Sequence, residues 1–143
     1  MNALKLLIDT WGWLTLRDRR EDLHKDAKEI YKSYREQEAT IYTTDYILDE
    51  TFTLIFKRLS KDLAYSSLDG IEQAIADGFI NLTWIDETRF NAAKQLRGKF
   101  VDKPNISFTD LTSMVVMEEL SITKILTNDD HFLYVGKNFE TLP

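Results

Sequence analysis

The chain has 143 residues, of which 43% are hydrophobic and 29% charged, and its formal net charge is −6. These values fit one globular domain and exclude a disordered tail, a collagen-like fibre and a low-complexity linker. The absence of cysteine excludes disulfides, thiolate metal sites and a cysteine nucleophile, and the acidic balance excludes a domain-wide basic surface for nucleic acid.

We expect a single domain over residues 1–143, because no window is rich in Ser, Gly or Pro and no segment repeats. The apolar start carries Lys5 and Asp9, which does not fit a signal peptide. No stretch approaches the roughly 20 apolar residues of a membrane span. The sequence therefore predicts a cytoplasmic protein without a membrane segment.

In the first half of the chain, short apolar runs alternate with amphipathic segments. Residues 4–8 form an apolar run that predicts a strand buried on both faces. Residues 22–38 have apolar side chains at helical spacing and predict an amphipathic helix. A short strand over 40–42 follows, and then two helices over 46–59 and 61–77, the second closed by a glycine.

The second half continues the alternation. Residues 79–84 predict a strand that places Ile80, Leu82 and Trp84 on its buried side. Asp86 caps a helix that we expect to stop at Gly98. The remaining elements are a loop over 101–107, a helix over 109–120, and strands over 124–127 and 139–142.

This order predicts an α/β fold, a three-layer α/β/α sandwich around a parallel sheet. Ligands of such sheets bind at the carboxyl ends of the strands, and Asp9 and Asp129 follow two predicted strands there. A group of carboxylates at one sheet edge would repel, and a hard divalent cation such as Mg²⁺ or Mn²⁺ would relieve the repulsion. The alternative is structural, because Asp also favours turns and helix caps.

Four short segments favour a metal site over a purely structural role for these acids. Their sequences are Leu-Ile-Asp-Thr-Trp at 7–11, Thr-Asp-Tyr-Ile-Leu-Asp-Glu-Thr at 44–51, Ser-Phe-Thr-Asp at 107–110 and Ile-Leu-Thr-Asn-Asp-Asp-His-Phe at 125–132. In this order and spacing the chain resembles the PIN-domain ribonucleases, and within them the toxin-like VapC branch. The resemblance covers residues 6–132 and implies a PIN-like fold.

The resemblance also implies a catalytic and metal-binding set. It consists of Asp9, Glu50, Asp110 and Asp129, which would bind Mg²⁺ or Mn²⁺ and support endonucleolytic hydrolysis of RNA. Thr10 and Thr127 would offer supporting hydroxyl groups to these acids.

Neighbouring residues leave alternatives open. Asp49 adjoins Glu50 and Asp130 adjoins Asp129; the motif favours Glu50 and Asp129. Asp45 is a possible supporting residue before the helix, and His131 is expected to pack or hydrogen-bond below the site.

Other side chains are candidates for contact with RNA. Trp11 and Trp13 follow the first strand and offer rings for base stacking, whereas Trp84 is expected in the core. The densest basic groups are Arg17, Arg19 and Arg20, and Lys57, Arg58 and Lys61.

The family resemblance implies partners as well: an RNA substrate, a cognate antitoxin protein and a homodimer. The helix over 46–59 carries more apolar surface than one buried stripe needs, so we expect an antitoxin groove or a subunit contact there. The alternative function is a catalytically inactive PIN-like module that binds RNA or protein; the presence of all four acids favours the enzyme.

Overall fold

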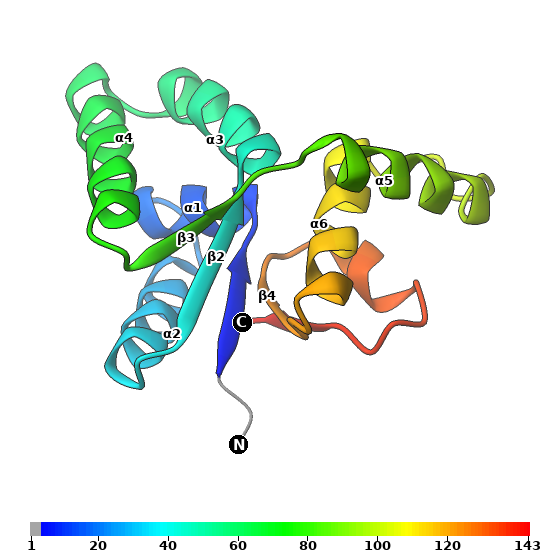
Figure 1. The fold of residues 1–143 in the computed structure, drawn as a ribbon. Helices are drawn as coiled ribbons and strands as arrows, with labels where there is room; N and C mark the ends of the chain where they lie inside the picture. Colours follow the sequence, from blue (N-terminus) through cyan, green and yellow to red (C-terminus); the bar gives the residue numbers. More distant parts are fainter. Residues whose placement is uncertain (1–3) are drawn as a thin grey trace.

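A parallel five-stranded sheet forms the centre of the computed structural model, which describes residues 4–143 (Figure 1). The strands are β1 (Lys5–Ile8), β2 (Thr40–Thr44), β3 (Ile80–Thr83), β4 (Lys124–Leu126) and β5 (Glu140–Leu142). Their spatial order is β3-β2-β1-β4-β5, and every neighbouring pair is parallel. The order reverses direction beside β1, and the crevice between β1 and β4 is therefore the switch point at which ligands of such sheets bind.

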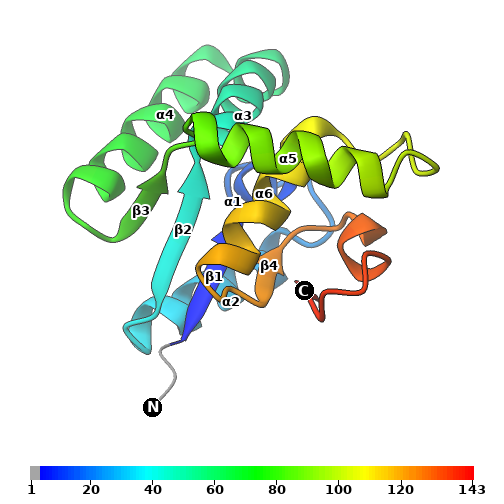
Figure 2. The same cartoon turned by 45° about the vertical axis from the view of Figure 1, so that its right-hand side comes forward.

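Helices cover both faces of this sheet, as predicted for a three-layer α/β/α fold. They are α1 (Thr10–Arg17), α2 (His24–Glu36), α3 (Asp45–Arg58), α4 (Lys61–Ala76), α5 (Glu87–Lys99) and α6 (Phe108–Glu119), with a short 3₁₀ helix η1 (Asp130–Leu133). In Figures 1 and 2, α1, α2 and α4 lie on one side of the sheet and α5 and α6 on the other. Among the described residues, none of these helices has the length and hydropathy of a membrane span.

The core explains why the short apolar runs form strands. Leu6, Leu7 and Ile8 of β1 are fully buried, because helices pack on both faces of the central strand. Helix α6 is also buried almost all round, from Asp110 to Met117. One continuous core cluster joins the sheet to the helices on both sides.

Helix α1 is the α-helix that the sequence did not indicate. Its residues Gly12, Trp13 and Leu14 are all buried, so no polar stripe marks a helical period. Gly12 lets the helix approach the sheet, since a Cβ atom there would lie 2.6 Å from the carbonyl oxygen of Leu126. The prediction that Trp13 offers a ring to RNA is wrong: it is buried, and its Nε1 donates to Thr43 Oγ1 at 3.1 Å.

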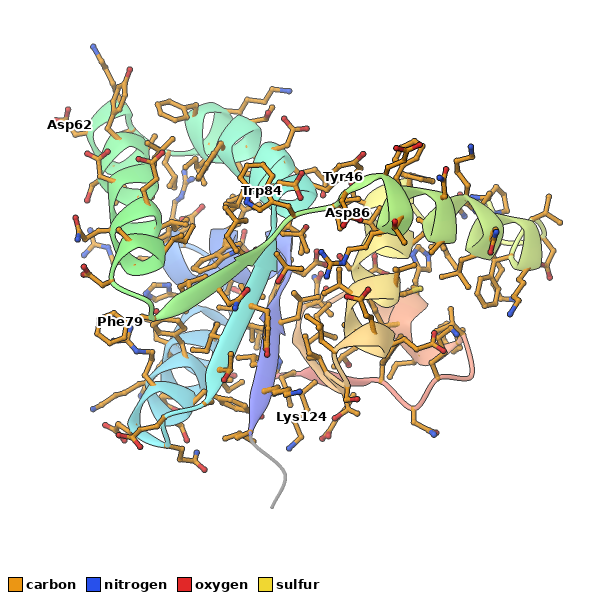
Figure 3. All side chains as sticks on the ribbon, viewed as in Figure 1. Tyr46, Asp62, Phe79, Trp84, Asp86 and Lys124 are labelled. Atoms are coloured by element: carbon orange, nitrogen blue, oxygen red, sulfur yellow. The ribbon has the colours of Figure 1, made fainter. Side chains whose placement is uncertain are left out.

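Two predictions around β3 and α5 also fail. The Trp84 side chain is 63% exposed rather than in the core, because β3 ends at Thr83 and the chain leaves the sheet (Figure 3). Gly98 does not stop α5, which continues to Lys99. The predicted cap of this helix is confirmed, since the Asp86 side chain accepts a hydrogen bond from the Arg89 backbone N–H.

Candidate functional site

The site begins at the switch point between β1 and β4. Asp9 directly follows β1, and its backbone N–H donates to the carbonyl oxygen of Leu126 at 3.2 Å. Thr127 follows β4, and its hydroxyl donates to Asp9 Oδ2 at 2.9 Å. The Asp9 carboxylate is thus buried and held in one orientation by the neighbouring strand end.

Glu50 reaches the site from α3. The Thr10 hydroxyl, at the start of α1, donates to Glu50 Oε1 at 2.9 Å. Thr44 caps the N-terminus of α3 by accepting a hydrogen bond from the Ile47 backbone N–H, which sets where the helix starts. Thr10, the residue after Asp9, therefore orients Glu50.

Asp110 comes from the first turn of α6, where a capping box fixes it. Ser107 Oγ accepts a hydrogen bond from the Asp110 N–H at 3.0 Å, and Asp110 Oδ2 accepts one from the Ser107 N–H at 3.3 Å. Ser107 was not singled out as a site residue, although a Ser three residues before an acid at a helix start is a recognisable signal.

Asp129 and His131 lie together after β4. The Thr127 hydroxyl accepts from the Asp129 N–H at 3.1 Å, and Asp129 Oδ1 accepts from the His131 N–H at 2.9 Å. His131 Nδ1 is 3.0 Å from Asp129 Oδ1 and 3.7 Å from Asp110 Oδ2, and it makes no hydrogen bond of acceptable geometry. Thr127 therefore connects Asp9 with Asp129.

We call Asp9, Glu50, Asp110 and Asp129 the acid cluster. Burial raises the pKa of Asp9 from 3.8 to about 6, with further increases from the charges of Glu50 and Asp129. Burial also raises the pKa of Asp110, and the charges of Asp9 and Asp129 raise it further. The four acids are therefore close enough to repel, and a compensating positive charge would stabilise their ionised forms.

Two acids of the cluster, Asp110 and Asp129, form a candidate cation site together with His131. Asp110, Asp129 and His131 each offer a ligand atom, and these atoms lie within 4.8 Å of one another. Carboxylate oxygens suit Mg²⁺ and Mn²⁺, whereas imidazole is a less usual ligand for Mg²⁺. His131 Nδ1 is buried and without a hydrogen-bond partner, so a cation or a water molecule at this place would also satisfy that atom.

The acids next to the cluster in sequence, Asp45, Asp49 and Asp130, lie in other surroundings. Asp45 Oδ1 accepts a hydrogen bond from the Ile85 backbone N–H at 2.7 Å, so this carboxylate holds the connection between β3 and α5. Asp45 and Asp49 together line a cavity between α3, α4 and β3. Asp130 is exposed at the start of η1.

Two of the basic candidates have structural partners. Arg20 binds both carboxylate oxygens of Asp18, at 2.9 and 3.0 Å, and also donates to the carbonyl oxygen of Arg58. Arg17 donates to Ser67 Oγ at 2.7 Å. These contacts join α1 to α4 and the loop after α1 to α3.

Comparison with known proteins gives consistent matches. The sequence matches the model of the PIN-domain family over residues 6–138. A VapC ribonuclease of Archaeoglobus fulgidus is 31% identical over 131 residues, which cover 88% of this chain and 78% of that relative.

Solved structures agree in fold. The crystal structure of Mycobacterium tuberculosis VapC20, described as a Sarcin-Ricin loop cleaving toxin, has a TM-score of 0.78 at 23% identity and covers 92% of this chain and 95% of its own. The structure of Rickettsia felis VapBC2 bound to a DNA fragment from their promoter has a TM-score of 0.69 at 15% identity. The match covers 98% of this chain and 100% of that chain.

Proposed function

The chain belongs to the PIN-domain family, and on that premise we propose that it is a metal-dependent endoribonuclease, the toxin of a toxin–antitoxin pair. The observation that carries the proposal is the acid cluster. Its members come from the ends of β1 and β4, the second turn of α3 and the first turn of α6, and their charges interact. We further propose that residues 1–143 form a single domain and that the protein acts in the cytoplasm.

Asp9, Glu50, Asp110 and Asp129 would hold Mg²⁺ or Mn²⁺. The bound cation would supply charge stabilisation at the phosphoryl oxygens and a nucleophile from water at neutral pH. The chain's own contribution is to keep the four carboxylates in place. Thr127 holds Asp9, Thr10 holds Glu50, and the capping box holds Asp110.

Cleavage of a single-stranded RNA by the purified protein tests the proposal. We expect cleavage with Mg²⁺ or Mn²⁺, loss of cleavage in excess EDTA, and a loss of a hundredfold or more in Asp9→Asn. Activity that persists in EDTA would reject the metal-dependent mechanism. RNA binding without cleavage by the metal-loaded wild type would favour the alternative, an inactive PIN-like binding module.

For the antitoxin partner, α3 offers less apolar surface than its sequence suggested. Leu48 and Ile55 are buried in the protein's own core, and Phe56 packs edge-to-face on Tyr65 of α4 with ring centroids 5.0 Å apart. A groove of about 620 Å³ lies between α1, α2 and α4, over Leu16 and Ile71.

We propose that an amphipathic antitoxin segment binds in this α1–α2–α4 groove. On its α2 side three lysines, Lys25, Lys28 and Lys32, outnumber one acid, Glu29, so the partner segment would carry acidic residues beside its apolar face. Gly70 on the α4 side has open space around its Cα, and Gly70→Trp would fill the groove. We expect the wild type to co-purify with its co-expressed antitoxin and Gly70→Trp to bind it at least tenfold more weakly, with cleavage unchanged.

Equal antitoxin binding by the wild type and Gly70→Trp would reject this groove. A homodimer also stays a prediction, which light scattering of the free protein tests directly.

A further inference from the structure

We propose that a cavity beside the acid cluster binds an unpaired nucleobase of the RNA next to the bond that is cut. The cavity, of about 630 Å³, lies between the loop that joins α5 to α6 and the end of η1. Its lining includes Tyr134, Asn105 and Lys103, and also Asp102. This inference rests on the proposed ribonuclease function and adds a substrate subsite to it.

One residue, His131, lies against both the cavity and the acid cluster. His131 lines the cavity and also places its Nδ1 3.0 Å from Asp129 Oδ1. Asp129 and Tyr134 are the two capping residues of the same 3₁₀ helix, η1, and the Tyr134 N–H donates to the carbonyl oxygen of His131. A nucleotide whose phosphate reaches the acid cluster therefore has its base within reach of this cavity.

The side chains in the cavity suit a base rather than an apolar ligand alone. The Tyr134 side chain is 65% exposed, so its ring is free to stack on a base. Asn105 is exposed, and its amide carries both donors and an acceptor, which match the edge of an unpaired base. Lys103 supplies a positive charge for a neighbouring phosphate, although Asp102 lies 3.7 Å from its Nζ.

The α5–α6 loop is held in shape by Arg97. Its guanidinium group donates to the carbonyl oxygens of Phe100 at 3.4 Å and Lys103 at 3.2 Å, and also to that of Ile106. Ile106 itself is buried and anchors the end of the loop. One wall of the cavity is therefore formed before any ligand binds, which lowers the cost of binding.

Tyr134→Ala removes the stacking ring, and Tyr134→Phe keeps it. The matched control is Leu133→Ala, since Leu133 is an exposed residue of the same helix and does not line the cavity. With a short single-stranded RNA we expect Tyr134→Ala to raise KM about tenfold with kcat nearly unchanged, and Tyr134→Phe and Leu133→Ala to behave as wild type.

A series of RNAs that each lack one base locates the subsite. We expect one such RNA, with the missing base next to the cleaved bond, to be cut equally well by wild type and Tyr134→Ala. Wild-type behaviour of Tyr134→Ala on intact RNA, or an equal defect in Leu133→Ala, would overturn the subsite.

A binding measurement separates this inference from the proposed catalysis. In the Asp9→Asn background we expect Tyr134→Ala to bind fluorescein-labelled RNA about tenfold more weakly by anisotropy, whether or not the wild type cleaves it. Equal affinity in this background would overturn the subsite even if metal-dependent cleavage is found.

Discussion

At the scale of single residues, Asp9 is under two opposing influences. Burial, followed by the charges of Glu50 and Asp129, favours the neutral form, whereas hydrogen bonds from the Thr10 backbone N–H and the Thr127 hydroxyl favour the charged form. The unfavourable effects are larger, and the pKa rises to about 6. When Asp9 is ionised and no metal is bound, it therefore lowers the free energy of unfolding.

The pH dependence of unfolding follows from this shift. The folded metal-free protein keeps a proton on Asp9 that the unfolded chain releases above its ordinary pKa of 3.8. The free energy of unfolding should therefore fall as the pH rises from about 4 through 6, and further where Asp110 ionises. Asp9→Asn should raise the free energy of unfolding by up to about 3 kcal/mol at about pH 8 in EDTA, and change it little near pH 4.

Urea unfolding at the two pH values checks this, with Asp130→Asn as the control because Asp130 is exposed. Destabilisation of Asp9→Asn at about pH 8 would instead mean that Asp9 is needed for the fold itself.

Ser107 carries a second prediction at this scale. Ser107→Ala removes the hydroxyl that caps α6, and should lower the free energy of unfolding by about 1 kcal/mol. It should also reduce RNA cleavage, because Asp110 loses one of the contacts that orient it. Ser107→Asp keeps a capping oxygen and should restore stability, though its charge adds to the repulsion. Thermal unfolding and cleavage rates of both variants test the argument, and wild-type stability of Ser107→Ala would contradict it.

At the scale of elements, two glycines in helices have opposite roles. Gly12 lies where α1 crosses the sheet, and a Cβ atom would lie 2.6 Å from a backbone oxygen and 2.9 Å from Ile8 Cγ2. Gly70 lies on α4, and a Cβ atom added there would have no neighbouring atom within 4 Å. For the stability of the fold, the first glycine is needed for packing, whereas the second weakens its helix.

Alanine substitutions should therefore change stability in opposite directions. Gly12→Ala should lower the free energy of unfolding by roughly 1–3 kcal/mol because backbone must move. Gly70→Ala should raise it by up to about 1 kcal/mol because alanine favours the helix. Denaturant unfolding of the two variants measures both effects; stabilisation by Gly12→Ala would contradict the close contact between α1 and β4.

The strand-ending acids show what a sequence can predict about elements. Asp9 and Asp129 follow short apolar runs that became β1 and β4, and the parallel order brings both strand ends to one crevice. Helix α1 escaped prediction because its residues are buried on every side and give no amphipathic period. The alternation of residues 79–84 predicts Trp84 on the buried side, but β3 ends one residue earlier, at Thr83, and leaves Trp84 exposed.

At the scale of the whole molecule, the acid cluster depends on contacts between distant parts of the chain. Only the family resemblance implies Glu50 and Asp110, because nothing in their local sequence indicates that α3 and α6 approach the same strand ends. Tyr134 was missed for the same reason: its position beside Asn105 exists only after the chain has folded. Local patterns thus predicted the layers, and the tertiary structure was needed to assemble the site.

The neighbouring pair Asp129 and Asp130 gives the most direct test of the central claim, that the acid cluster holds the metal used to cleave RNA. The substitutions Asp129→Asn and Asp130→Asn each remove one charge. The Asp129 carboxylate lies 3.0 Å from His131 Nδ1 and raises the pKa values of Asp9 and Asp110, whereas Asp130 is exposed. We predict that Asp129→Asn loses a hundredfold or more of the Mn²⁺-dependent RNA cleavage rate and that Asp130→Asn retains it. Equal rates in the two variants, or a loss confined to Asp130→Asn, would contradict this account.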